Sequence, residues 1–194
     1  MKRLFKYILI VFGLLISNGL YAQGQDWKLI LEMIILEDGK NLSGAEINVY
    51  RDGKFVEKVT SDNKGRVDVH LKPGGVYEVA IGGNNNFIKK KLQINTKNIP
   101  PEDVAEDRYF PAEVEIFKKI DGLNYDILEK PIGKIYYNPD KEEFDVDLEY
   151  TASMKSQLQK LQEDYLAQKE KEEKLQAQKK KEYDDAIKVA DKAF

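Results

Sequence analysis

The residue types that most often carry catalysis or bind metals are scarce in this chain. It contains no cysteine and a single histidine, His70. A protein zinc site takes about four ligands, and His70 has no histidine or cysteine to share a metal with. Residues 140–147 hold several carboxylates but lack the glycine and the spacing of a calcium loop. No glycine-rich phosphate loop or nucleophile elbow is visible. The sequence therefore predicts a protein that is not an enzyme, with no catalytic residue, no metal site and no cofactor.

The second group of candidate functional residues lies near the C-terminus, where the apolar residues follow a helical spacing. From Ser153 onward Ala, Gln, Glu, Lys and Leu dominate, and no Gly or Pro follows Pro139. This composition predicts one charged, partly amphipathic helix over residues 151–194, capped by Thr151 or Ser153. Its first apolar residues are spaced four, three and four apart, as in a coiled-coil seam. They are Met154, Leu158, Leu161 and Tyr165.

Two interpretations of this helix stay open. In the first, it is solvated and supported by charge pairs such as Glu170–Lys174, and its first turns pack on the rest of the protein. In the second, it forms a coiled coil with a second copy or with another protein. A partner's groove could also hold the sparse distal residues. The predicted partner-binding residues are Met154, Leu158, Leu161, Tyr165, Ile187 and Val189.

Two adjacent tyrosines form a further candidate surface. Tyr136 and Tyr137 lie in a predicted strand, which sends successive side chains to opposite faces. One ring should therefore be exposed if one face of the sheet meets solvent. An exposed aromatic could bind glycan or protein, but packing in the core or at a strand edge is the favoured interpretation.

The elements that must position these residues are mostly β-strands. Residues 42–81 alternate apolar and polar side chains in short runs, separated by Asp52-Gly53, by 63–65 and by 73–75. Alternation with turn residues between the runs is typical of half-buried antiparallel strands. Further strands are expected at 28–37, 87–95, 113–117, 132–137 and 144–148. The Lys89-Lys90-Lys91 run is interpreted as a solvated bend or edge.

The stretch 42–81 also resembles a known family. Leu42-Ser43-Gly44-Ala45 before a strand, the run 60–67, and the run 71–77 are similar to the carboxypeptidase-regulatory-like family. The resemblance covers roughly residues 28–95 and implies a transthyretin-like antiparallel β-sandwich. It also implies extracytoplasmic use in bacteria of the Bacteroidetes type, without peptidase activity. We assign residues 23–150 to this sandwich with a C-terminal strand elaboration; a small separate module at 109–150 is the alternative.

The first 22 residues are typical of a signal peptide. Lys2, Arg3 and Lys6 precede an apolar run at 8–16, and the small residue Ala22 ends a cleavage motif. The run is short for a membrane span, so we expect cleavage and no transmembrane span afterwards; an uncleaved anchor is the alternative. Removing residues 1–22 would leave 28 basic against 34 acidic residues. This mildly acidic balance argues against binding to nucleic acid.

These features favour a non-enzymatic exported envelope protein, periplasmic or associated with the outer membrane. It would act as a structural or protein-interaction module on an envelope protein partner. By analogy at the level of the fold, an accessory subunit of a secretion or gliding machinery would suit this design. The alternative is a β-sandwich that binds a glycan or peptide ligand for an uptake system.

Overall fold

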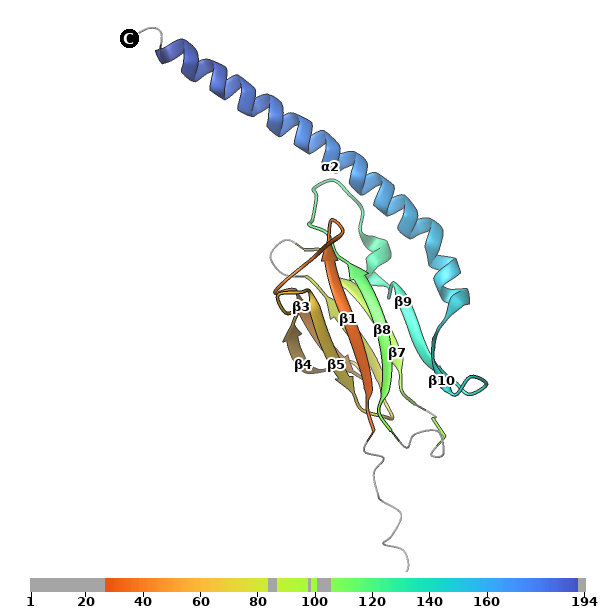
Figure 1. Ribbon diagram of the computed structural model, residues 1–194. Coiled ribbons are helices and arrows are strands. Elements are labelled where there is room, and N and C mark those ends of the chain that lie inside the picture. Colours follow the sequence, from red (N-terminus) through yellow and green to blue (C-terminus); the bar gives the residue numbers. More distant parts are fainter. Residues whose placement is uncertain (1–26, 84–86, 98, 101–105, 192–194) are drawn as a thin grey trace, which may run out of the picture.

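The computed structural model describes residues 27–83, 87–97, 99–100 and 106–191, with the side chains of 189–191 left out. The predicted signal peptide at 1–22 lies outside the described residues. Within these ranges the chain forms two β-sheets packed face to face, followed by one long helix that leaves the sandwich at one end (Figure 1). The mainly β fold with a long C-terminal helix, predicted from the sequence, is confirmed.

The first sheet is built around β1 (Leu29–Glu37). It pairs antiparallel with β5 (Arg66–Leu71) and with the short β2 (Lys40–Asn41). It also pairs in parallel with β8 (Arg108–Glu115), which returns from much later in the chain.

The second sheet contains the remaining strands in the order β10-β9-β7-β6-β3-β4. The strand bounds are β3 (Glu46–Arg51), β4 (Lys54–Thr60), β6 (Val76–Ile81), β7 (Lys90–Asn95), β9 (Gly133–Asn138) and β10 (Glu143–Val146). Neighbours in this sheet are antiparallel, except that β9 joins β7 in parallel. The late strands β8 and β9 thus each extend one of the two sheets by parallel pairing.

The core lies between the two sheets, where the alternating apolar residues of the sequence meet. Leu29, Leu31, Met33 and Ile35 of β1 are almost fully buried, opposite strands such as β3 and β6. Their polar neighbours along each strand point outward, because successive side chains alternate between the faces of a sheet. Burial of these aliphatic side chains, at about 25 cal/mol per Å², is the main stabilising contribution in a chain without disulfides.

The turn before β5 depends on a glycine. Gly65 has a φ of +71°, and its carbonyl accepts the Ile35 N–H at 2.8 Å. The Asp62 Oδ1 accepts the N–H groups of Lys64 and Arg66 at 2.7 and 2.9 Å, which closes the turn. Bonding to these N–H groups lowers the pKa of the Asp62 carboxyl. A Cβ at Gly65 would lie 2.7 Å from the Ile35 carbonyl oxygen, so only glycine fits this position without movement of the chain.

The helix α2 spans Leu148–Asp191 and begins three residues before the earlier of the two predicted caps. Its N-cap is Asp147, whose Oδ1 accepts the Tyr150 N–H at 2.8 Å. Thr151, one of the predicted caps, instead donates its hydroxyl to the Asp147 carbonyl within the first turn. The 3-10 helix η2 (Asp126–Glu129) lies in the connection that precedes β9. No helix in the described ranges is both long and apolar enough to cross a membrane.

Candidate functional site

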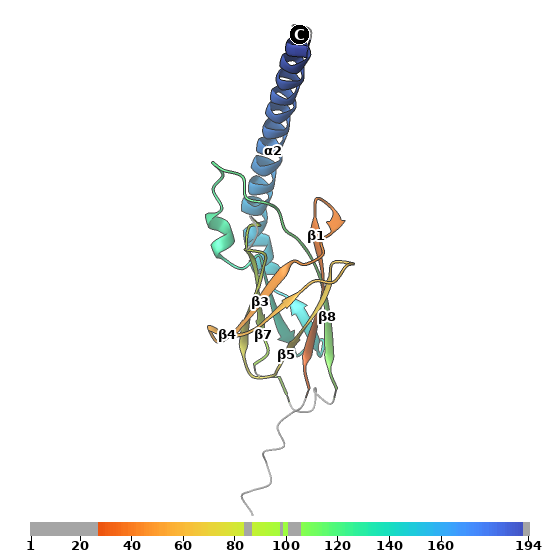
Figure 2. The same cartoon turned by 90° about the vertical axis from the view of Figure 1, so that its left-hand side faces the viewer.

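The first part of α2, residues 148–169, packs against one end of the sandwich beside β9, and we call it the docked half (Figures 1 and 2). Its first turn is held by Tyr150, whose hydroxyl donates to the Pro131 carbonyl at 2.7 Å. The Lys134 Nζ lies 4.1 Å from the centre of the same ring. About four turns further along the helix, the Tyr165 ring packs against Phe117 with centroids 4.5 Å apart.

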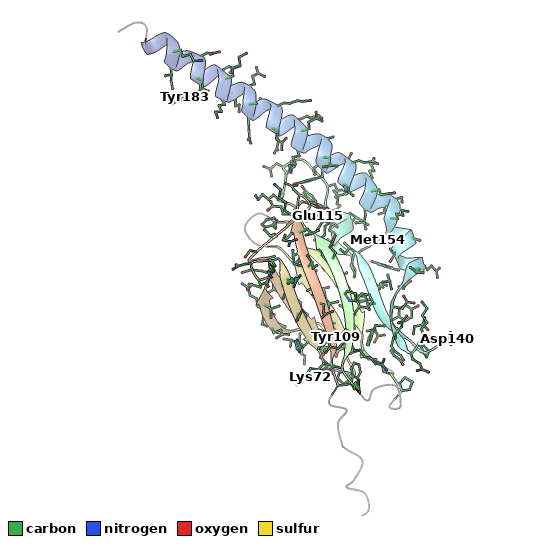
Figure 3. The ribbon with its side chains drawn as sticks, viewed as in Figure 1. Lys72, Tyr109, Glu115, Asp140, Met154 and Tyr183 are labelled. Atoms are coloured by element: carbon green, nitrogen blue, oxygen red, sulfur yellow. The ribbon has the colours of Figure 1, made fainter. Side chains whose placement is uncertain are left out.

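The residues of the predicted seam all lie in the docked half. Met154, Leu161 and Tyr165 are buried, and Leu158 is half-buried. Figure 3 shows Met154 between the helix and the sandwich. The assignment of these four residues to partner binding is therefore corrected, because the chain's own sandwich covers them. One stripe of a helix cannot seal against two surfaces at once.

Docking ends at an ion pair. The Lys169 Nζ lies 2.6 Å from the Asp38 Oδ2, in the turn that follows β1. The hydrogen bond to Asp38 raises the pKa of Lys169. In the described part of the chain, no later residue of α2 has a hydrogen bond or ion pair with the sandwich.

The second part of the helix, residues 170–188, is the free half, which extends beyond the sandwich in both views (Figures 1 and 2). From Glu173 to Lys188 every side chain is exposed. The predicted pair Glu170–Lys174 is present, with a 2.6 Å separation. Large apolar side chains are nevertheless exposed on this half. They are Leu175 (52% exposed), Tyr183 (67%) and Ile187 (42%).

Of the two distal residues predicted to bind a partner, Ile187 is thus available. Val189 belongs to α2, but its side chain lies outside the described part of the chain. Tyr183, labelled in Figure 3, lies on the same half of the helix, beyond the end of the sandwich, and is exposed.

The tyrosine pair is divided as strand alternation requires. Tyr136 is 39% exposed, whereas Tyr137 is 8% exposed and packs edge-on against Phe144. Tyr137 is therefore corrected from a candidate exposed aromatic to a core residue. The most exposed aromatic on the first sheet is Tyr109, which lies on β8 and not beside Tyr136.

The structure places the lysine run at the start of β7 differently from the solvated bend or edge that the sequence predicted. Lys90 and Lys91 lie in an interior strand of the second sheet, not at a solvated edge. Lys90 points inward, its Nζ donating to the Glu115 carbonyl and lying 4.5 Å from the centre of the Phe117 ring. Burial lowers the pKa of Lys90 to about 8, an effect that the nearby Glu115 carboxylate opposes. The signal was present in the sequence, because Lys90 shares the strand face of Leu92 and Ile94.

His70 is exposed on the outer face of β5, as its alternation with Val69 and Leu71 predicts. No cluster of three metal-ligating side chains occurs in the described ranges. The acidic run that follows β9 instead forms local contacts, including the Lys141–Asp145 ion pair at 2.5 Å.

The known proteins that resemble this chain do so with low sequence identity and low TM-scores. No protein-family model matches the chain, and no curated protein matches it. Among solved structures, the Bacillus anthracis TIE protein is 22% identical over 47% of this chain and 18% of its own, with a TM-score of 0.36. A 5-hydroxyisourate hydrolase from Klebsiella pneumoniae is 14% identical over 47% of this chain and 93% of its own, with a TM-score of 0.31.

A catechol 1,2-dioxygenase from an Acinetobacter species is 14% identical over 58% of this chain and 59% of its own, with a TM-score of 0.38. The chain thus spans less than two thirds of the TIE protein and of the dioxygenase. TM-scores below 0.5 carry no argument about activity, and the named reactions belong to those proteins. What this chain presents for function is its own geometry, namely a sandwich, a docked half and a free half.

Proposed function

We propose that this protein is a non-enzymatic exported envelope protein, periplasmic or associated with the outer membrane. It acts as a structural or protein-interaction module, and the free half of α2 makes the contact with an envelope protein. The observation that carries the proposal is the exposure of Leu175, Tyr183 and Ile187 on a helix that continues past its last contact with the sandwich.

The arrangement of these residues fits recognition by a groove. At about 100° per residue, Leu175, Tyr183 and Ile187 fall within an arc of roughly 120° on the helix surface. A helix that binds in a partner's groove presents its anchors on one such face. The surrounding lysines and glutamates keep the unbound helix soluble and suit the polar rim of an interface.

The position of the free half also supports an interaction role. The sandwich holds the docked half through apolar and aromatic packing, so the free half is presented at a defined place. A subunit of a secretion or gliding machinery is one class of assembly that would use such an arm, by analogy at the level of the fold. The alternative of a glycan-binding surface has less support, because Tyr109 and Tyr136 lie on different sheets.

The test is a crosslinking pull-down from cells, with the captured proteins identified by mass spectrometry. The test variant carries Tyr183→Ser and Ile187→Ser, which remove two exposed anchors without touching the sandwich. The matched control is Leu148→Ser, since Leu148 is an exposed leucine (72%) at the other end of the same helix.

The wild type and the control should capture the same envelope protein, and the double variant should lose it. Each anchor can contribute about 2 kcal/mol to binding, which is enough to abolish recovery of a moderately tight complex. Unchanged recovery of every captured protein by the double variant would reject the free half as the contact surface.

A further inference from the structure

A small cavity lies under the docked half of α2, at the end of the sandwich where β8 finishes. Its volume is about 160 Å³. The apolar part of its lining comes from both the sandwich and the helix, and includes Phe117, Leu128, Ile132, Leu158, Leu161 and Tyr165. In Figure 3, Glu115 marks this end of the sandwich below the helix. The cavity therefore exists only because α2 covers the end of the sandwich.

One cationic group reaches this cavity from the sandwich. Lys90 lines it, and its ammonium donates one hydrogen bond, to the Glu115 carbonyl, while lying over the Phe117 ring. An ammonium has three donors, and no second hydrogen bond from Lys90 occurs among the described residues. Lys90 is half-buried, so its remaining donors can meet an acceptor that enters the cavity.

The acidic side chains at the cavity are already engaged. The Asp38 carboxylate pairs with Lys169 at 2.6 Å, outside the apolar lining. The Glu115 Oε1 accepts the Gly39 N–H at 3.0 Å. The remaining polar lining residue, Gln162, is uncharged at any pH. Among the residues that line the cavity, Lys90 is the one with a positive charge, so it is the group that an added carboxylate would contact.

We propose that this cavity binds a small aromatic monocarboxylate, whose carboxylate accepts hydrogen bonds from Lys90 and whose ring lies between Phe117, Leu161 and Tyr165. The volume sets the size of the ligand, because an apolar cavity of about 150 Å³ holds a single benzene-sized molecule. A few polar groups in an otherwise apolar pocket fix the orientation of a ligand. This inference is independent of the protein contact proposed for the free half.

Sodium benzoate is the probe, titrated into the mature full-length protein and followed by NMR chemical shifts and calorimetry at pH 7. Benzoate should bind saturably, with shifts concentrated at Phe117, Leu161 and Tyr165. Benzylamine, which carries the opposite charge on the same ring, should bind at least tenfold more weakly. Equal binding of the two compounds, or no saturable binding of benzoate below 10 mM (about the limit of a specific fragment), would overturn the proposal.

A first variant and its control test whether the charge of Lys90 contributes to benzoate binding. Lys90→Met keeps a side chain of similar length without the charge and should weaken benzoate binding at least tenfold. Lys89→Met is the matched control, because Lys89 is exposed on the neighbouring position of the same segment, and it should leave binding unchanged. Unchanged affinity in Lys90→Met would overturn the role of the ammonium.

Leu161→Phe fills the cavity while Lys90 remains, and it should abolish binding without loss of the cooperative unfolding transition. If either variant does not fold, the location of the shifts in the wild type decides. Shifts at Phe117 and Leu161 support the proposal, and shifts confined to other residues reject it. Affinity should also fall as the pH rises through about 8, the pKa to which burial lowers Lys90.

Discussion

At the scale of single residues, Lys90 is the most informative position in the sandwich. A lysine that points between two sheets must lose part of its hydration. The Glu115 carbonyl and the Phe117 ring compensate part of that loss. Burial nevertheless lowers the pKa of its ammonium to about 8. The protein therefore keeps, next to a small cavity, a charge that opposes its own stability.

Replacing this lysine should stabilise the fold. Lysine titrates near 10.4 when unfolded, so between about pH 8 and 10.4 the unfolded chain binds more protons and stability rises with pH. Below about pH 8 the Lys90 ammonium is charged in the folded protein, and the full cost of burying that charge reduces the stability. Lys90→Met should raise the free energy of unfolding at pH 7 by on the order of 2 kcal/mol. It should also remove the rise between pH 8 and 10.

Urea denaturation of the wild type and Lys90→Met at pH 7 and pH 9.5 measures both effects. Lys89→Met serves as the control, since Lys89 is exposed and its charge should have little influence. A lower free energy of unfolding for Lys90→Met at pH 7 would show that the two contacts of the ammonium outweigh its burial.

Gly65 offers a second test at this scale. Gly65→Ala forces a Cβ to within 2.7 Å of the Ile35 carbonyl oxygen, at a φ of +71°. Gly53→Ala is a matched control, with a similar φ of +78° and no atom within 4 Å of the added Cβ. We expect Gly53→Ala to cost about 1 kcal/mol and Gly65→Ala about 2–4 kcal/mol, measured by thermal unfolding. Equal losses would mean that the close approach to Ile35 relaxes without strain.

The sequence already held part of the information about Lys90. In the expected strand at 87–95, the period of two places Lys90 on the same face as the apolar residues Leu92 and Ile94. The run of three lysines was instead interpreted by its composition, which favours solvent. What covers the ammonium could not be predicted, because Phe117 and Tyr165 come from distant parts of the chain.

At the scale of elements, α2 combines two environments in one uninterrupted helix. The sequence predicted the helix and its apolar seam, and the structure adds the surface on which that seam packs. This surface includes Phe117 and residues near η2, which no local pattern marks as a docking site. The helix start was missed by three residues because Asp147 was assigned to the strand region and not to a cap.

The strand β8 shows how the edge of the first sheet is protected. Arg108 and Ile116 donate their N–H groups toward β1. Backbone groups alternate in direction along a strand, and Pro111 is an odd number of residues from both, so its nitrogen faces the open edge. Proline has no N–H to donate there. Toward the end of the same edge, Lys90 bonds the Glu115 carbonyl. Together these residues oppose the addition of another strand.

The division of α2 predicts the outcome of a truncation. Removing residues 172–194 keeps the docked half with its last contact, the Lys169–Asp38 pair. The melting temperature should change by only a few degrees, because the removed residues that the structure describes are mostly exposed. Removing residues 154–194 is the contrasting variant, because it exposes the surface around Phe117. We expect a clearly lower melting temperature for this longer truncation, recorded by circular dichroism; similar stability of the two truncations would contradict the division.

At the scale of the whole molecule, the fold class could be predicted, but part of the topology could not. Alternating strands and turn residues indicated a sandwich, and the antiparallel hairpins follow from short connections. The parallel pairing of β8 with β1 joins residues roughly 80 positions apart, and no turn specifies it. Such a pairing depends on which strand edges are left unpaired after the hairpins have formed, and that is not visible in the local sequence pattern.

Export is a property of the whole chain that can be tested directly. Residues 1–22 have the basic, apolar and small-residue order of a signal peptide. N-terminal sequencing of protein purified from the envelope should find Gln23 as the first residue, with allowance for its cyclisation. An intact Met1 in the same fraction would indicate an uncleaved anchor.

The ion pair between Lys169 and Asp38 lies at the point where the helix α2 extends beyond the sandwich. From that point to Asp191 the helix extends by roughly 33 Å, at about 1.5 Å per residue. A tilt of only about 10° at the junction would sweep the tip through about 6 Å over that length. A stiff arm of this kind samples a thin shell of space at nearly fixed radius, unlike a flexible tail, which spreads over a volume. Two such proteins anchored to one surface would hold their tips at a common height, and the sandwich would set that height.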